Sequence, residues 1–363
     1  MTAQETTFAL LRSRHGMPHA PLPPASAQGL MAVLEFAGRQ GVAPLLAGGL
    51  RRMTNAPAGW TALLPMLEAV AIDNRRKQQN FLAAATKLVS LLHGAGIMHV
   101  FLKGMAFLLE DQKSGADRSL TDIDVLVHDR DVGPAVFLLR NHGYCEGDDL
   151  GGYDAGVHHH YPALHDDDCG IFVELHLRLM QYDRQNAIAT PDIFADAQHR
   201  VMNGMTFAIP SPTHRMFHLI AHAQISNLGH VLRQITLRDA SDAMALQIHH
   251  AIDWEALQLI MRRIGAETEL LEFLLAVHRL LGLALPFPEK DFQSARNWAD
   301  TAVAALSTPV PKLRTSWRLA AHYAHYFVSD PARACLMIRT LVQPARLKDL
   351  IRINRSRLGP PGN

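Results

Sequence analysis

The spacing of hydrophobic residues changes along the chain and divides it into three parts. In "QGLMAVLEFAGRQG" and "RRKQQNFLAAATKLVSLLHGAG", apolar residues lie three and four positions apart, which is typical of amphipathic helices. Each segment ends at a glycine, a frequent helix C-cap. We therefore predict an N-terminal helical segment over residues 29–95, preceded by an irregular arm over residues 1–28 that contains the proline-rich stretch "MPHAPLPPAS".

Between residues 96 and 180 the hydrophobic pattern becomes that of strands. "IMHVFLKG", "TDIDVLV" and "CGIFVELHLRL" are short, rich in β-branched residues and bounded by turn residues. The segments "MAFLLEDQ" and "DVGPAVFLLRNHG", which lie between them, have helical spacing. The order strand, helix, strand, helix, strand predicts a small mixed α/β unit.

Beyond residue 190 the pattern is almost entirely helical, as in "SPTHRMFHLIAHAQ" and "ETELLEFLLAVHRLLG". The whole pattern predicts an α+β fold. A small mixed β-sheet core at residues 96–180 is flanked by N-terminal helices and by an all-helical C-terminal domain over residues 190–363.

The composition narrows the function classes. The 35 basic residues nearly balance the 34 acidic ones, so no overall field favours nucleic acid, although it is not excluded. Three cysteines without CxxC spacing argue against a disulfide framework or a zinc knuckle. The most apolar stretch, at residues 270–287, is interrupted by Glu272, His278 and Arg279, and the N-terminus has no signal-peptide pattern. We expect a cytoplasmic protein without a membrane span.

Two aspartates break the apolar pattern of the second predicted strand. Alternation places Ile123, Val125 and Val127 toward a core and puts Asp122 and Asp124 together on the other face. Neighbouring carboxylates repel each other unless a cation lies between them. Mg²⁺ is typically held by one or two carboxylates together with substrate phosphates, so the pair is a candidate metal site.

The third predicted strand offers another carboxylate. Glu174, His176 and Arg178 alternate with apolar residues, and Glu174 would join the two aspartates if the strands are neighbours. Three clustered carboxylates suit two metal ions, of which one activates a nucleophile and the other stabilises a leaving phosphate. The alternative interpretation is a polar strand face exposed to solvent.

The segment "FLKGMAF" between the first strand and its helix is a candidate phosphate-binding turn. Gly104 would allow backbone to approach a phosphate, and the helix that follows would present free N–H groups. Lys103 and Arg118 could each contact a triphosphate, although an ion pair with a neighbouring carboxylate explains either residue about as well.

In this order of motifs the chain resembles the DNA polymerase β-type nucleotidyltransferase superfamily, and in particular a bacterial branch of nucleotidyltransferase-like proteins. The resemblance rests on "GIMHVFLKG", "RSLTDIDVLV", "HGY" and "VELHLRL", and spans roughly residues 30–250. It implies transfer of a nucleoside monophosphate from an NTP to an unknown acceptor, with Mg²⁺ or Mn²⁺. Asp122, Asp124 and Glu174 would be catalytic and hold the metal, while Lys103, Gly104 and Arg118 would bind the nucleotide. Met105 replaces the serine or glycine that often follows the glycine in that superfamily.

Two histidine-rich stretches could add chemistry. In "VHHHYPALHDDDCG" we favour a solvated connection into the third strand over a zinc site, with His159 or His160 facing the carboxylates as an intermediate reading. His214, His218 and His222 recur every four residues, so we expect one helix stripe that is buried between helices, or that contacts a nucleotide.

The basic residues of the last 33 positions, Arg333, Arg339, Arg346, Lys348, Arg352, Arg355 and Arg357, could contact an anionic partner, but a solvated or docking helix explains them better.

Other functions remain open at this point. The same fold could nucleotidylate a partner protein, as an antitoxin-like enzyme would, or modify a peptide or sugar. It could also be a non-catalytic nucleotide-binding or interaction module. A metal hydrolase built on the His/Asp stretch at residues 158–168 is the remaining alternative.

Overall fold

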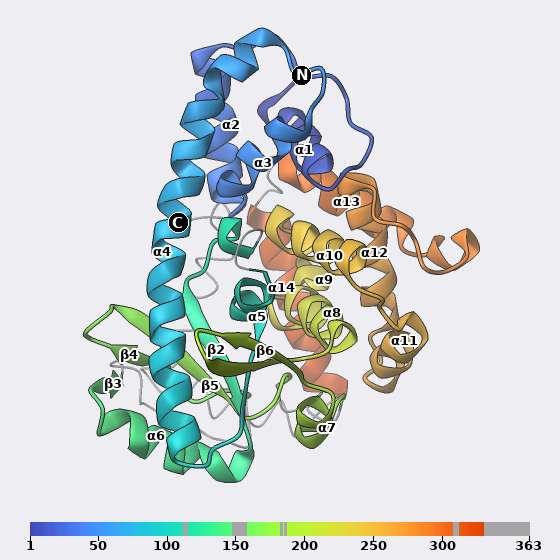
Figure 1. Ribbon diagram of the computed structural model, residues 1–363. Coiled ribbons are helices and arrows are strands. Elements are labelled where there is room, and N and C mark those ends of the chain that lie inside the picture. The colour runs from blue at the N-terminus through green and yellow to red at the C-terminus, as the bar shows by residue number, and fades with distance from the viewer. Residues whose placement is uncertain (112–114, 147–157, 182–183, 185–186, 308–311, 330–363) are drawn as a thin grey trace.

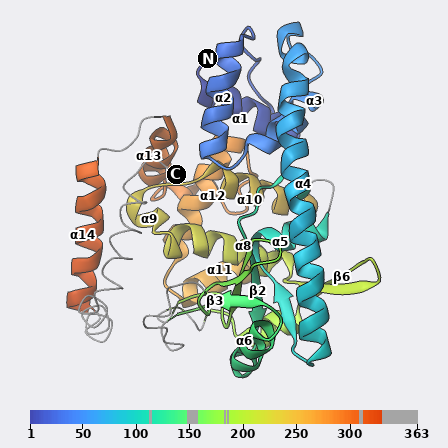
Figure 2. The ribbon, with the colours of Figure 1, turned by 90° about the vertical axis from the view of Figure 1, so that its left-hand side faces the viewer.

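Helix α4, Ala58–Gly94, runs along one side of the molecule and connects the N-terminal helices to the β-sheet (Figures 1 and 2). The computed structural model describes residues 1–111, 115–146, 158–181, 184, 187–307 and 312–329. Trp60 and Leu67 of α4 belong to a large hydrophobic core shared with the N- and C-terminal helices, whereas Phe81 and Leu88 belong to a second core against the sheet. The helix therefore spans both cores.

The N-terminal part is helical from its third residue. Its elements are α1 (Ala3–Arg14), α2 (Ala27–Arg39), a 3₁₀ turn (Ala43–Leu45) and α3 (Leu46–Arg52). The prediction of an irregular arm over residues 1–28 is wrong for α1. A capping box between Thr2 and Glu5 starts this helix, and Leu10 and Leu11 are fully buried. Arg12 also donates hydrogen bonds to the carbonyls of Leu280 and Arg279, across the chain.

The five-stranded sheet has the order β1-β2-β5-β4-β3. Its strands are β1 (His99–Phe101), β2 (Asp122–Val127), β3 (Tyr144–Glu146), β4 (Leu164–Asp166) and β5 (Ile171–His176). The helical elements between them are α5 (Lys103–Glu110), α6 (Val132–Arg140) and two 3₁₀ turns, Gly115–Asp117 and Asp129–Asp131. β2 and β5 are parallel, and the other pairs are antiparallel. The predicted mixed sheet is confirmed, with β3 and β4 as short strands that the pattern did not predict.

The two faces of the sheet are buried against different elements. Ile123, Val125 and Val127 lie in the core that α4, α5 and α6 complete. On the opposite face Leu126 belongs to the core shared with the C-terminal helices. Since residues two apart share a face, the even-numbered positions of β2 point toward those helices. Asp122 and Asp124 occupy such positions and therefore face the C-terminal helices.

A second, two-stranded sheet interrupts the region that was predicted to be helical. β6 (Gln198–Met202) and β7 (Met205–Ile209) form a hairpin whose turn residues, Asn203 and Gly204, both have positive φ, the signature of a tight hairpin turn. β7 packs on β1, α4 and α5, with Phe207 fully buried. The prediction of an all-helical domain over residues 190–363 is therefore wrong at this hairpin, because an apolar strand completes the sheet core.

The remaining elements are helices, and several cover the carboxylate face of the sheet. They are α7 (Thr190–Ala195), α8 (Pro212–Ala221), a π-helical turn (His222–Ser226), α9 (Gly229–Leu232), α10 (Leu237–His249), α11 (Trp254–Arg263), α12 (Glu267–Leu281), a 3₁₀ turn (Glu289–Phe292), α13 (Arg296–Ser307) and α14 (Lys312–Ser329). The observed architecture is the predicted α+β arrangement, with helices at both ends. No helix in the described ranges is long and apolar enough to cross a membrane. The basic residues at positions 333–357 lie outside those ranges.

Candidate active site

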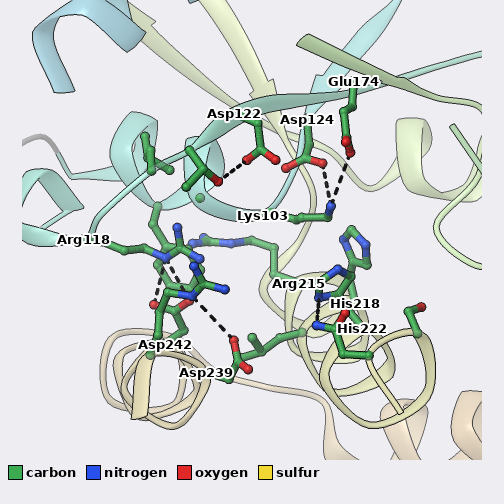
Figure 3. Close-up of a pocket in the computed structure, with 18 of the residues that line it drawn as sticks. Lys103, Arg118, Asp122, Asp124, Glu174, Arg215, His218, His222, Asp239 and Asp242 are labelled. Atoms are coloured by element: carbon green, nitrogen blue, oxygen red, sulfur yellow. Dashed lines mark hydrogen bonds and ion pairs between the residues drawn. The ribbon is translucent and has the colours of Figure 1, made fainter. Parts of the chain in front are cut away.

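Three carboxylates meet where β2 and β5 run side by side. The parallel register pairs Asp124 with Glu174, and Asp122 lies two residues earlier on the same face of β2. In Figure 3 the three side chains point into one space. Asp124 is almost completely buried, whereas Asp122 and Glu174 are half-buried. The exposed strand face considered as an alternative is therefore not what the structure shows for Asp124.

Lys103 supplies a positive charge between these carboxylates. Its Nζ donates to Asp124 Oδ1 at 2.6 Å and lies 3.9 Å from Glu174 Oε2 (Figure 3). Burial alone would lower the pKa of Lys103, but the charges of Asp124 and Glu174 outweigh burial and raise it. The backbone of Lys103 has φ of 44°, a left-handed conformation that costs energy for a residue with a side chain. The ammonium that balances the carboxylates therefore belongs to a residue with a strained backbone conformation.

The two aspartates have opposite electrostatic environments. Burial raises the pKa of Asp122, and repulsion from Asp124 and Glu174 adds to the rise. For Asp124 burial acts in the same direction, but Lys103 and His176 outweigh it and hold its pKa well below the usual range. Asp124 is therefore ionised near neutral pH.

His176 of β5 is completely buried on the carboxylate face. Its Nε2 lies 2.8 Å from Asp124 Oδ1 and 3.6 Å from Glu174 Oε2. The closer carboxylate, that of Asp124, is therefore the hydrogen-bond partner of His176. Burial would lower the pKa of His176, and the contacts with Asp124 and Glu174 raise it. Its Nδ1 is buried without a hydrogen-bond partner.

The ligand atoms of Asp124, Glu174 and His176 lie within 4.8 Å of one another, close enough to hold one metal ion. Carboxylate oxygens suit Mg²⁺, and a set with one imidazole nitrogen also suits Mn²⁺. The donor chemistry therefore fits a divalent ion. Asp122 lies beside this group, and its Oδ1 accepts a hydrogen bond from Thr121. Among the described residues this is the only such group.

The carboxylates form one end of a cavity of about 350 Å³, and basic side chains line another part of it. All six residues singled out from the sequence line it: Lys103, Gly104, Arg118, Asp122, Asp124 and Glu174. Arg215 of α8 and Arg238 of α10 also line it, and Figure 3 shows Arg118 and Arg215 across from the aspartates. One cavity therefore combines an anionic, metal-compatible end with a cationic part.

Arg215 is the most deeply buried of these arginines. Its Nη1 donates to Glu110 Oε2 at 2.6 Å, and its guanidinium lies over the Phe107 ring, 4.5 Å from the centroid. Its Nε and Nη2 are buried without any hydrogen-bond partner. Unpaired donors of a buried guanidinium are costly, which makes Arg215 a candidate ligand-binding residue.

Gly104 lies inside the first turn of α5, and its neighbours explain why it has no side chain. A Cβ at this position would lie 2.0 Å from Leu120 Cδ2 and 2.3 Å from Arg118 Nη1. The glycine thus makes room for Leu120 and Arg118, which differs from the close phosphate approach expected from the sequence. Arg118 in turn donates from Nε to Asp242 of α10.

The histidine-rich stretch divides into two parts. His159 and His160 line the cavity, and their rings lie 5.2 and 5.3 Å from that of His176. The members near β4 have other partners, since Asp166 and Asp168 accept from Lys87, and His165 contacts Asp167. Within the described residues no metal-ligand group forms in this stretch, so a hydrolase site there has no geometric support.

The three histidines spaced four residues apart, His214, His218 and His222, lie in two different environments. His218 and His222 line the cavity, while His214 does not and lies 3.6 Å from Asp196. His218 Nε2 is buried without a partner. Burial lowers the pKa of His218, and the charge of Lys103 lowers it further. With these lowered pKa values, His218 and His222 are neutral near pH 7.

Four charged residues that line the cavity were missed from the sequence: Arg215, Arg238, Asp239 and Asp242. They lie in α8 and α10, where helical periodicity marks a buried face but does not reveal what it faces. The segment "LRDASD" contains two acidic residues, Asp239 and Asp242, that α10 buries. Charged residues are rarely buried without a partner, so their position on this helix was a signal of a site.

The chain belongs to a family described as uncharacterised nucleotidyltransferases, whose model matches residues 27–282. The matched region begins at α2, ends just after α12 and includes every residue of the cavity. Membership supports nucleotidyl transfer as the general function. No curated protein matches the sequence.

Proposed function

We propose that this protein transfers a nucleoside monophosphate from an NTP to an acceptor hydroxyl in the cavity between the sheet and α8–α10. The observation that supports the proposal best is the register that sets Asp124 beside Glu174, with Lys103 in contact with both. An oxygen of the acceptor would form a bond to the α-phosphorus. The bond from that phosphorus to the bridging oxygen would break, and pyrophosphate would leave.

Asp124, Glu174 and His176 would hold a divalent ion, Mg²⁺ or Mn²⁺, and Asp122 would contribute to a second one. Such ions activate a nucleophile and neutralise charge that develops on phosphate oxygens. Glu174 would also accept the proton of the acceptor hydroxyl. Burial would raise its pKa, but the nearby His176 and His160 lower it, so the carboxylate is ionised.

Lys103 would have two roles. Without a metal it balances the charge of Asp124. With a metal ion on Asp124, the Lys103 ammonium would be free to contact a phosphate oxygen. Arg118, Arg215 and Arg238 would provide further positive charge to the triphosphate. Gly104 would allow Arg118 to lie at the start of α5.

The proposal is tested by calorimetric binding of each of the four NTPs, with and without Mg²⁺, to the native protein and to Asp122→Asn/Asp124→Asn. These substitutions keep the size of the side chains and remove two negative charges. We expect one NTP or more to bind only with the metal and only to the native protein. An Asp129→Asn variant on an exposed turn is the matched control.

Incubation with the NTP that binds, labelled at the α-phosphate, then identifies the reaction. A labelled small molecule, peptide or protein from a cell extract would reveal the acceptor class, and the label should require Glu174. A folded native protein that binds no NTP in the presence of Mg²⁺ or Mn²⁺ would contradict the proposal. So would full transfer activity in Glu174→Gln.

A further inference from the structure

A second cavity, of about 490 Å³, lies next to the first. Its walls include residues of α1, α3, α5, the 3₁₀ turn Gly115–Asp117 and α10. Phe107, Arg118, Arg238 and Asp242 line both cavities, so the Arg118–Asp242 ion pair forms part of the wall between them. The volume is in the range of pockets that bind small molecules.

Three of the four carboxylates that line the second cavity have a basic partner. Asp117 accepts from two arginines, Arg14 at 3.1 Å and Arg75 at 2.8 Å. Glu110 contacts Arg215, Arg200 and His250. Asp242 is paired with Arg118. These three carboxylates are therefore already occupied within the protein.

Three basic side chains of the lining have weak contacts or none. Within the described chain the side chains of Arg52 and His249 have no ion pair or hydrogen bond, and Arg238 Nε makes a long ion pair with Asp239 Oδ1 at 4.0 Å. Arg238 Nε is also buried without a hydrogen-bond partner. These three side chains come from α3 and the two ends of α10, and all line the same space.

His15 lies close to several basic side chains of this cavity. His15 lines the cavity and its Nε2 contacts Ser241 Oγ at 2.9 Å. Burial lowers the pKa of His15 to about 3, and the charges of Arg14, His249 and Arg52 contribute to the decrease. Guanidinium groups bind phosphate and carboxylate groups through paired donors, so the cavity favours an anion.

We propose that the second cavity binds a small molecule bearing phosphate or carboxylate groups, at a site separate from the nucleotide pocket and held by Arg52, Arg238 and His249. The ligand would lie against the same Arg118–Asp242 pair that borders the first cavity. Binding here is independent of the transfer reaction proposed above, and it can be measured without nucleotide or metal.

The test uses inorganic phosphate and citrate as probes, in EDTA, with the full chain, by calorimetry and by thermal stabilisation. We expect saturable binding of at least one probe, and the preferred probe distinguishes a phosphate from a carboxylate ligand. The Arg52→Ala/His249→Ala variant should bind at least about tenfold more weakly, since each lost charged hydrogen bond reduces affinity by about that factor.

Two control variants locate the site. Arg51→Ala removes the neighbouring exposed arginine, which pairs with Glu68, and should bind the probe like the native protein. Lys103→Met removes a positive charge that lines only the first cavity and should also retain binding. The proposal is overturned if neither probe binds the native protein, or if binding survives in Arg52→Ala/His249→Ala. Loss of binding in Lys103→Met alone would assign the anion to the nucleotide pocket and also overturn it.

Discussion

Arg118 Nε donates to both carboxylate oxygens of Asp242, at 3.0 and 2.8 Å, although the two residues are 124 positions apart. Arg118 lies just before β2, and Asp242 lies on α10. Both side chains are mostly buried. The ion pair therefore fixes the carboxylate strand to the helix that closes the cavity, and each partner alone would be a buried unpaired charge.

We predict that Arg118→Met or Asp242→Leu lowers the free energy of unfolding by about 3–5 kcal/mol. The double variant Arg118→Met/Asp242→Leu should lose less than the sum of the two, because no charge is left unpaired. Urea unfolding of the four proteins measures this coupling. Arg51→Met, which breaks an exposed ion pair, should cost below about 1 kcal/mol. Strict additivity of the two buried changes would refute the interpretation.

Lys103→Met should make the protein more dependent on divalent ions. The substitution leaves the charges of Asp124 and Glu174 without their lysine partner, so a bound metal then relieves more repulsion. We expect Mn²⁺ to raise the melting temperature by at least about 2 °C more in the variant than in the native protein. Lys87→Met removes a lysine from Asp166, away from the cavity, and is the control. An equal rise in all three proteins would contradict the prediction.

Arg215→Met should weaken nucleotide binding while Arg200→Met leaves it unchanged. Both arginines contact Glu110, but only Arg215 lines the cavity, where its Nε and Nη2 have no partner. One charged hydrogen bond contributes about 1.5–3 kcal/mol, so the Kd should rise at least about tenfold. Calorimetry with the preferred NTP compares the two variants. The same Kd in both would mean that Arg215 has only a structural role.

His15 should make the stability depend on pH below about 6.5. Its pKa is about 3 in the folded protein and 6.5 when unfolded, so between these values the unfolded chain binds the extra proton. Stability is therefore lost as the pH falls through this window and is unaffected above it. Between pH 7.5 and 5 the loss amounts to about 2 kcal/mol. Urea unfolding measures the free energy of unfolding at pH 7.5 and at pH 5. The difference between the two should be smaller by about 2 kcal/mol in His15→Gln than in the native protein. The same difference in both proteins would contradict the prediction.

The carboxylate cluster could be predicted because it depends on short-range rules. Alternation along one strand brought Asp122 and Asp124 to one face, and the same rule put Glu174 opposite the apolar residues of the next strand. The prediction also assumed that the two strands are neighbours in the sheet. The parallel pairing of Asp124 with Glu174 fulfils this assumption. The mixed sheet and its flanking helices followed from the same periodicities.

The rest of the cavity could not be predicted in this way, because it depends on contacts between distant segments. Arg215 and Asp242 lie on helices whose apolar spacing does not specify the docking partner. The hairpin of β6 and β7 is a different case. Its Asn203-Gly204 pair, flanked by alternating apolar residues, is a strong hairpin signal that the helical interpretation of the region overlooked. The short β3 and β4 strands, three residues each, have no periodicity long enough to detect.

The two hydrogen bonds from Arg12 to the carbonyls of Arg279 and Leu280 have a practical consequence for anyone expressing part of this protein. A fragment trimmed to the family match, residues 27–282, would retain every residue of the first cavity but lose α1 and, with Arg14 and His15, part of the second cavity. The last turn of α12 would then lose two of its donors, and the apolar surface that covers Leu10 and Leu11 would be exposed to water. Such a fragment is expected to aggregate, and the first helix should be kept in any shortened version intended for binding studies.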